Sequence, residues 1–214
     1  MSAAYTVILP HKRNDGNDAA LRICLDCLNR NSTHDYILLM DAAYDAPLYE
    51  RINRMVQHAP TECCVYLASD TFFAPDWDTP MLALYDDHSF VTNVLVECGA
   101  ICVHPESIHK DFGRKPETFD RAGFEAYVLE APVPSGEGWY CPYMFPRSGY
   151  LAHGGLEIGL TGDHHGFTSA DVALFERWKA AGNRVIRAKS YAYHLQRWSE
   201  KSEQVHEKRE LHSP

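Results

Sequence analysis

The chain has 214 residues, 45% of them hydrophobic, and a net charge of −9 at pH 7. This length and composition predict a single α/β domain over residues 1–199, followed by a charged tail at 200–214. The negative charge argues against broad, non-specific binding to nucleic acid, because such binding depends on Lys and Arg neutralising phosphates.

The opening residues, MSAAYTVILPHKR, lack the basic segment and the apolar run that a signal peptide requires. A run of about 18 uncharged apolar residues, the length that crosses a bilayer, does not occur in the sequence. We therefore expect a cytoplasmic protein without a membrane span.

The seven cysteines are an odd number and lack the spacing of a secreted disulfide framework, so we expect them to be reduced. Cys24 and Cys27 form one C-x-x-C pair. They repeat with Leu21 and Leu28 at helical spacing, which favours the buried stripe of a helix over a redox or zinc site.

The first half of the chain alternates between two kinds of apolar pattern. Strands are predicted at 5–9, 36–40 and 63–68, and helices at 17–30 and 48–59. Alternation with short connections implies right-handed crossovers and a parallel sheet covered by helices. We expect a Rossmann-like, nucleotide-binding half over about residues 1–95.

The second half, about residues 96–199, is less regular. We expect it to bind the acceptor and to contain the catalytic groups. Its predicted elements are strands at 89–97 and 100–105, a helix at 116–131, a loop-rich stretch at 133–155 with a strand at 143–146, a helix within 169–185 and a strand at 191–195. Ser169 is the expected N-cap of the last helix, and Gly182 is its expected stop.

Polar residues follow each of the first three strands. The strand ends read PHKR at 10–13, DAAYD at 41–45 and SDT at 69–71. Ligands of open α/β sheets gather at the carboxyl ends of the strands, so these three ends predict a site. Trp77 and Asp78, further on, are read as a helix start that packs beneath it, with Trp77 in the core.

The order of several motifs resembles the family-2 glycosyltransferases of the GT-A fold over roughly residues 5–195. The motifs are VILP, LLMDAAYD, LASDTFFAPDWD, YMFPRSGYLAHGGLEI, TSADVALFERWKAAGNRVIRA and YAYHL. The resemblance implies a mostly parallel central sheet flanked by helices, with an acceptor-side extension.

On the donor side, the resemblance implies that Asp41 contacts the nucleotide base, and that Pro10 and Arg13 lie near the base or the phosphates. A surface arginine without a role in binding is the alternative for Arg13. Ser69 and Asp70 fall on the family's DXD motif, which holds a divalent cation on the pyrophosphate of a sugar nucleotide. This sequence keeps one carboxylate of that motif. A hard cation with oxygen ligands stabilises a leaving diphosphate, so Asp70 suits a Mn²⁺ or Mg²⁺ ligand.

His194, after the last strand, resembles the histidine that some family members use as a further metal ligand, and an imidazole favours Mn²⁺. A core histidine with satisfied hydrogen bonds is the alternative. The segment from Arg147 to Leu156 resembles the family's stretch in which an arginine-bearing strand is followed by a Gly-Gly turn, here Gly154-Gly155, under the donor sugar and the acceptor.

Asp171 corresponds to the aspartate of the family's ED helix start, which acts as catalytic base, although Ala170 replaces the Glu. An attacking hydroxyl must lose a proton, so a carboxylate in reach is required. We expect Asp171 to be ionised at pH 7, because a helix N-terminus favours an anion. A simple first-turn role is the alternative, and Asp163 is the second candidate base.

Other residues of the second half have two readings each. His164 and His165 either contact the acceptor or the pyrophosphate, or form a solvated loop pair. Trp139, Tyr140 and Tyr143 either stack on sugars and bases or belong to the core, and Phe145 is read as core.

These features together favour an inverting, metal-dependent glycosyltransferase of the hexosyltransferase type, which moves a sugar from a UDP-sugar to a hydroxyl acceptor. A nucleotidyltransferase is an alternative, but LPHKRNDGND has one glycine where a Gly-rich loop is usual. A non-catalytic sugar-nucleotide-binding or scaffold protein is another. The acceptor stays open between a glycan, a lipid-linked sugar, a protein and a modified nucleic-acid base, and an oligomer is possible.

Overall fold

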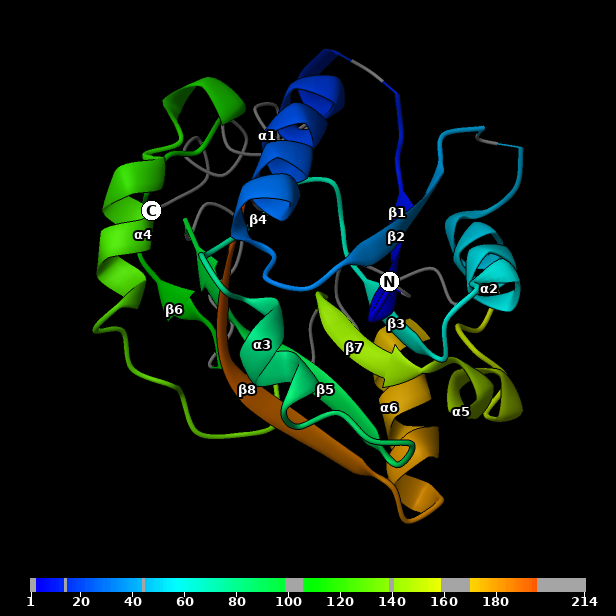
Figure 1. The fold of residues 1–214 in the computed structure, drawn as a ribbon. Coiled ribbons are helices and arrows are strands. Elements are labelled where there is room, and N and C mark those ends of the chain that lie inside the picture. Colours follow the sequence, from blue (N-terminus) through cyan, green and yellow to red (C-terminus); the bar gives the residue numbers. More distant parts are fainter. Residues whose placement is uncertain are drawn as a thin grey trace, which may run out of the picture.

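The computed structural model describes residues 3–13, 15–43, 45–98, 106–138, 141–158 and 170–195. These residues contain one eight-stranded sheet in the order β2-β1-β3-β7-β5-β8-β4, with β6 beside β5 (Figure 1). The strands are β1 (Tyr5–Pro10), β2 (Tyr36–Asp41), β3 (Cys63–Tyr66), β4 (Thr71–Phe73), β5 (Ser89–Glu97), β6 (Ile108–His109), β7 (Tyr143–Pro146) and β8 (Arg184–His194).

Helices connect and cover these strands. They are α1 (Asp15–Asn31), α2 (Leu48–His58), α3 (Asp78–Leu82), α4 (Arg121–Val128), α5 (Arg147–Ala152) and α6 (Ala170–Ala180), with a 3₁₀ turn at Pro116–Thr118. In Figure 1, α2, α5 and α6 lie together at the right of the view, and α4 lies at the left.

The first half confirms the predicted alternation of strands and helices. Strand β1 is parallel to both β2 and β3, with Pro10 opposite Asp41 and Ile8 opposite Tyr66. The carboxyl ends of the three strands therefore share one edge of the sheet, where the three polar segments were expected.

The second half makes the sheet mixed rather than purely parallel. Strand β7 enters between β3 and β5 and is antiparallel to both, and β4 is antiparallel to β8. Strand β5 is parallel to β8, with Glu97 opposite His194. The carboxyl ends of β5 and β8 therefore lie side by side.

Strands β1, β3, β5 and β7 are buried on both faces of the sheet. Val7 and Leu9 belong to one core cluster and Ile8 to the other, because successive side chains of a strand point to opposite faces. Cys24 and Cys27 of α1 are buried in the first cluster and are free cysteines, as their helical spacing predicted. The second cluster packs α2, α5 and α6 against the sheet.

Trp77, Phe145 and Tyr143 are all buried. The first two confirm the sequence-based core assignment. For Tyr143, burial decides between the two readings in favour of the core.

Two predicted elements were wrong in extent. The helix expected at 116–131 is interrupted, because Asp120 caps a new helix by accepting a hydrogen bond from the Gly123 amide at 2.9 Å. Helix α6 ends at Ala180, and β8 already begins at Arg184, well before the strand expected at 191–195. Gly182, with φ of +84°, occupies the left-handed conformation expected of a helix stop.

Segment 147–152 forms helix α5, where the family resemblance implied an arginine-bearing strand. The strand expected at 100–105, the N-cap Ser169 and the tail at 200–214 lie outside the described residues. The described helices include none with the length and apolar content needed to cross a membrane.

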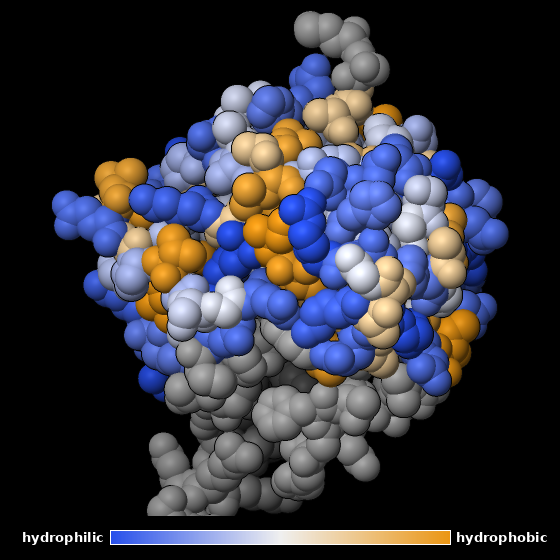
Figure 2. Space-filling view, turned by 90° about the horizontal axis from the view of Figure 1, so that it is seen from below, coloured by the Kyte–Doolittle hydropathy of each residue, from blue (hydrophilic) through white to orange (hydrophobic). Residues whose placement is uncertain are grey.

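The exposed large apolar side chains include Ile37 and Met40 on the edge strand β2. On the face shown in Figure 2, apolar surface forms separate patches among hydrophilic residues.

Candidate functional site

Asp70 is placed at the carboxyl edge of the sheet by pairing between β4 and β8. Thr71 lies opposite His194 in this antiparallel pair, and the Leu195 amide donates a hydrogen bond to the Asp70 carbonyl at 3.2 Å. The backbone therefore brings Asp70 next to His194, although the two residues are far apart in the sequence.

The side chain of His194 lies between two carboxylates. Its Nε2 is 3.6 Å from Asp70 Oδ2, and its Nδ1 is 3.1 Å from Glu97 Oε1. Burial lowers the pKa of His194, but the charges and hydrogen bonds of Asp70 and Glu97 outweigh burial and raise the pKa to about 10. His194 is therefore a partly exposed histidine paired with two acids at the edge of the site.

Glu97 was not among the residues proposed from the sequence. Its side chain is only 7% exposed, and it also accepts a hydrogen bond from Ser107 Oγ at 2.8 Å. The signal that could have found it is an acid at the last position of the apolar strand SFVTNVLVE, the same pattern that pointed to Asp70.

The donor atoms of Asp70 and His194 fit a shared divalent cation. Adjacent ligand atoms of an octahedral ion are about 3 Å apart. Asp70 Oδ2 and His194 Nε2 are 3.6 Å apart, so a small approach of the two atoms would let them bind one ion. Among the described residues, no group of three or more His, Cys, Asp and Glu is arranged to hold a metal. Further ligands would come from water and from a substrate phosphate, as is usual for hard cations on nucleotides.

Ser69 contacts a buried histidine at the end of β1. The Ser69 hydroxyl is 3.3 Å from His11 Nδ1, and Asp18 Oδ1 is 2.7 Å from His11 Nε2. Since a carboxylate accepts, a neutral His11 donates from Nε2 to Asp18, and its Nδ1 accepts from Ser69. The sequence indicated Ser69 and placed His11 in the polar segment after the first strand, but it did not indicate Asp18.

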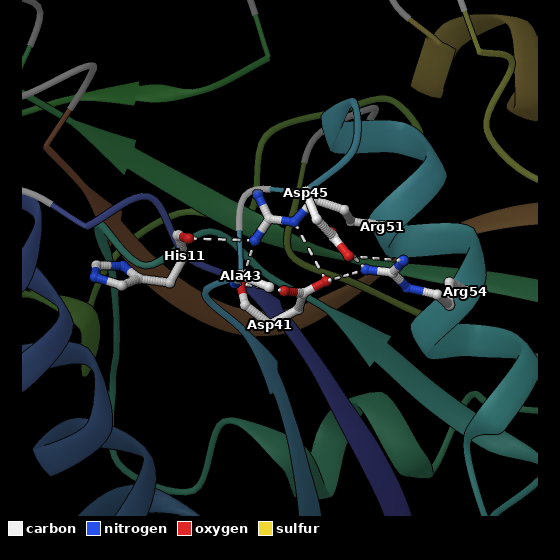
Figure 3. Close-up of polar contacts among 6 residues, drawn as sticks. All are labelled: His11, Asp41, Ala43, Asp45, Arg51 and Arg54. Atoms are coloured by element: carbon white, nitrogen blue, oxygen red, sulfur yellow. Dashed lines mark hydrogen bonds and ion pairs between the residues drawn. The ribbon is translucent and has the colours of Figure 1, made fainter.

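Figure 3 shows the surroundings of Asp41. Its Oδ2 accepts from Arg54 Nη2 at 3.0 Å and is 3.3 Å from Arg51 Nε, and its Oδ1 accepts from the Ala43 amide at 2.8 Å. Burial raises the pKa of Asp41, but these three donors outweigh burial and bring the pKa below its ordinary value. Most of the hydrogen-bonding capacity of the carboxylate is therefore already used within the protein.

Arg51 joins the ends of β1 and β2. Its side chain is buried, and Nη2 donates to the carbonyls of Asp41 and His11, the latter at 3.3 Å (Figure 3). Pro10 is buried at the end of β1 opposite Asp41, whereas Arg13 is exposed three residues later. Arg51 thus connects the carboxyl ends of β1 and β2, where the expected nucleotide-binding residues lie.

Asp171 lies in the first turn of α6 and contacts the central strand β7. The Tyr143 hydroxyl donates a hydrogen bond to Asp171 Oδ1 at 2.9 Å. Burial raises the pKa of Asp171 to about 6, against the lowering effect of that hydrogen bond. The pKa therefore moves upward and not downward as the helix dipole suggested, but a carboxyl with this pKa is still largely ionised at pH 7.

The charges of both Asp70 and Asp171 act on the thiol of Cys141. Its thiol donates to the Tyr66 carbonyl at the end of β3, with Sγ and O 3.7 Å apart. Burial raises the pKa of this thiol, and the charges of Asp171 and Asp70 raise it further. Both carboxylates therefore act on one side chain at the carboxyl end of β3.

Arg147 lies at the other end of β3. Strand β7 is antiparallel to β3, so Arg147, which follows Pro146, is brought to the amino end of β3. There its amide donates to the Glu62 carbonyl at 2.7 Å, and its Nε is 3.7 Å from Glu62 Oε2. The chain direction of β7 thus separates Arg147 from Asp70.

The turn Gly154-Gly155 is held from two sides. Arg177 Nη2 of α6 donates to the Gly155 carbonyl at 2.6 Å, and a Cβ on Gly155 would lie 2.6 Å from Asn53 Oδ1 of α2. Both glycines have positive φ, 81° and 62°. The turn borders an open cavity of about 380 Å³ lined by Glu50, Asn53, Arg54, Gln57, Leu151, Gly154 and Gly155.

That cavity has neither Asp70 nor Asp171 among its lining residues. Asp163, His164 and His165 lie outside the described residues, as do Trp139 and Tyr140.

Comparison with known proteins identifies solved structures with a similar fold. No protein-family model and no curated protein sequence matches the chain. Among solved structures, GalNAc-T7 with UDP, GalNAc and Mn²⁺ is similar at a TM-score of 0.59 and 9% identity, over 90% of this chain and 43% of that chain. S. aureus TarS (residues 1–349) in complex with UDP is similar at 0.50 and 9% identity, over 90% and 58%.

Both are GT-A-type glycosyltransferases. The chain has the GT-A fold. It spans about half of the length of the two solved chains, and the low identity restricts the likeness to the fold.

Proposed function

We propose that this chain is a GT-A glycosyltransferase of the family-2 type, which transfers a sugar from a UDP-sugar to a hydroxyl acceptor with inversion. The observation that carries the proposal is the placement of Asp70 beside His194 at the carboxyl edge of the sheet, with Oδ2 and Nε2 3.6 Å apart. Asp171, in the first turn of α6, is half-buried and accepts a hydrogen bond from the hydroxyl of Tyr143 of β7.

Asp70 and His194 form the side of the site at which the diphosphate leaving group of the sugar nucleotide would lie. Their facing Oδ2 and Nε2 atoms supply one oxygen and one nitrogen ligand for Mn²⁺ or Mg²⁺, and the nitrogen favours Mn²⁺. When bound, such an ion neutralises the negative charge that develops on the departing diphosphate. Ser69, in contact with His11, stands next to Asp70 and would contact the donor on the same side.

Asp171 forms the acceptor side. An inverting displacement needs one base, which takes the proton of the attacking hydroxyl as the new bond forms at C1 of the sugar. A carboxylate with a pKa of about 6 is a stronger base than an ordinary aspartate and is still ionised at neutral pH. Tyr143 fixes its orientation, and Asp163 stays a second candidate for the same role.

The nucleotide would lie along the ends of β1 and β2, near Pro10, Arg13 and Asp41. Arg54 and the Ala43 amide donate to the Asp41 carboxylate and Arg51 is ion-paired with it, so Asp41 has reduced capacity left for a base. Arg147 has no part in this proposed site, because it lies at the opposite end of β3. The acceptor class, a glycan, lipid-linked sugar, protein or modified nucleic-acid base, stays open.

The test has two stages. Calorimetry of the full chain with UDP is expected to show binding in Mn²⁺ that EDTA abolishes, and a panel of UDP-sugars is then assayed for slow hydrolysis. Binding without any turnover, with acceptors included, would support the non-catalytic alternative. A preference for a nucleoside triphosphate and release of pyrophosphate would support a nucleotidyltransferase instead.

A further inference from the structure

We propose that Glu97 is a positioning residue for the metal-binding form of His194. By accepting the Nδ1 proton, it directs Nε2 toward Asp70 as the coordinating nitrogen. This inference rests on the cation site of the proposed function, and it adds a residue to which neither the sequence nor the fold comparison assigned a role.

The arrangement is built into the sheet and not into a loop. His194 is the last residue of β8 and has Thr71 of β4 opposite it on one side and Glu97 of β5 on the other. Asp70 directly precedes Thr71. Three neighbouring strand ends therefore present an acid, the histidine and a second acid in a row.

Glu97 is itself held in place. Strand β6 pairs with the end of β5, with His109 opposite Glu97, and the Lys110 amide donates to the Glu97 carbonyl at 3.0 Å. From the residues just before β6, Ser107 Oγ donates to Glu97 Oε2 at 2.8 Å, while Oε1 faces His194 at 3.1 Å. The two carboxylate oxygens thus have different partners, which fixes the rotation of the carboxyl group.

The consequence for His194 follows from imidazole chemistry. A carboxylate can only accept at Nδ1, so Nδ1 carries the proton and Nε2 presents its lone pair when the ring is neutral. Nε2 lies 3.6 Å from Asp70 Oδ2, so the lone pair and the Asp70 carboxylate face the same volume. Carboxylate partners of metal-bound histidines typically change metal affinity by about 10–100-fold when they are mutated.

The experiment measures Mn²⁺ binding and does not depend on turnover. The full chain with saturating UDP is titrated with Mn²⁺ and followed by electron paramagnetic resonance, and nitrogen coupling to the bound ion is recorded by electron spin echo modulation. Glu97→Gln is expected to weaken Mn²⁺ binding by about 10–100-fold, because an amide can donate as well as accept and no longer selects one tautomer. Ser107→Ala is expected to act in the same direction with a smaller effect.

Two controls separate positioning from loss of charge or fold. Asp111→Asn removes a nearby negative charge whose contacts are with Arg114 and the Gly113 amide, and it is expected to keep wild-type Mn²⁺ affinity. In a His194→Ala background, nitrogen coupling disappears, and adding Glu97→Gln is expected to cause no further loss of affinity. Thermal unfolding of every variant reports on the fold.

Wild-type Mn²⁺ affinity in Glu97→Gln, or an equal loss with and without His194, would overturn the positioning role while leaving the cation site intact. Failure of the wild-type protein to bind Mn²⁺ in the presence of UDP would overturn the cation site itself. If Glu97→Gln does not fold, Ser107→Ala decides the question, because it disturbs the same carboxylate through one hydroxyl.

Discussion

The hydroxyl of Tyr143 donates a hydrogen bond to Asp171 Oδ1 at 2.9 Å, which ties the first turn of α6 to the central strand β7. Tyr143 is fully buried, so the position of the Asp171 carboxyl is set by the core of the protein. The hydrogen bond also favours the ionised carboxylate and opposes the effect of burial on its pKa.

Tyr143→Phe is therefore expected to shift the pH dependence of catalysis. With Asp171 as base, kcat/KM rises as pH increases through its pKa of about 6 and levels off above it. Loss of the hydrogen bond raises that pKa further, so the acidic limb moves to higher pH and the variant loses more activity at pH 6 than at pH 8. Tyr191→Phe, which removes a buried hydroxyl bonded to the Ala131 carbonyl, is the matched control. If the acidic limb of the pH dependence of kcat/KM stays at the same pH in Tyr143→Phe, Asp171 does not determine that limb.

Asp171→Asn is expected to lower kcat by about 10²–10⁴-fold, the usual contribution of a positioned base. The KM for the donor should barely change, because the base acts mainly in the transition state. Steady-state kinetics with the UDP-sugar identified by the screen measure both quantities. Asp163→Asn is run in parallel, and near-normal turnover of Asp171→Asn together with loss in Asp163→Asn would reverse the two assignments.

Asp70→Ala is expected to weaken UDP binding in Mn²⁺ and to leave the melting temperature nearly unchanged. The side chain is 24% exposed at the edge of the sheet, so its removal creates little cavity in the core. Calorimetry with and without EDTA measures the effect. Equal UDP affinity of the wild type in Mn²⁺ and in EDTA would contradict a metal-dependent site.

Asp41→Ala is expected to reduce both stability and nucleotide selectivity. Arg51 is only 1% exposed, and leaving its buried charge without the carboxylate typically costs about 3–5 kcal/mol. If Asp41 also contacts the base, the variant loses affinity for UDP and prefers it less over other nucleoside diphosphates. Urea unfolding and a nucleotide binding series measure the two effects.

Asp45→Ala is the matched control for Asp41, because Asp45 contacts the same Arg54 from an exposed position. It should change stability little. An unchanged ranking of nucleotides in Asp41→Ala, together with lowered stability, would assign Asp41 a purely structural role at the end of β2.

Local patterns in the sequence were sufficient to predict the strands and helices of the first half of the fold. They also predicted that the carboxyl ends of these strands carry polar residues. The strand and helix periodicities around β1, β2 and β3 arise within short segments, so they could be read without knowledge of distant contacts. Asp70 stood out because it follows the third predicted strand, and the resemblance to the family-2 glycosyltransferases indicated the roles of both Asp70 and Asp171. In the structure Asp70 lies beside His194 and Asp171 accepts a hydrogen bond from Tyr143, and the roles of both acids stay predictions.

Only the tertiary structure decided how distant segments meet. Glu97 faces His194 because β5 and β8 are parallel in one register, and a shift by one residue would turn either side chain to the other face. Arg147 lies away from the site because β7 runs antiparallel to β3. Asp41 is engaged by Arg51 and Arg54 because α2 packs its charged residues against the end of β2. Strand order, strand direction and helix packing are non-local, so no short stretch of this sequence encodes them by itself.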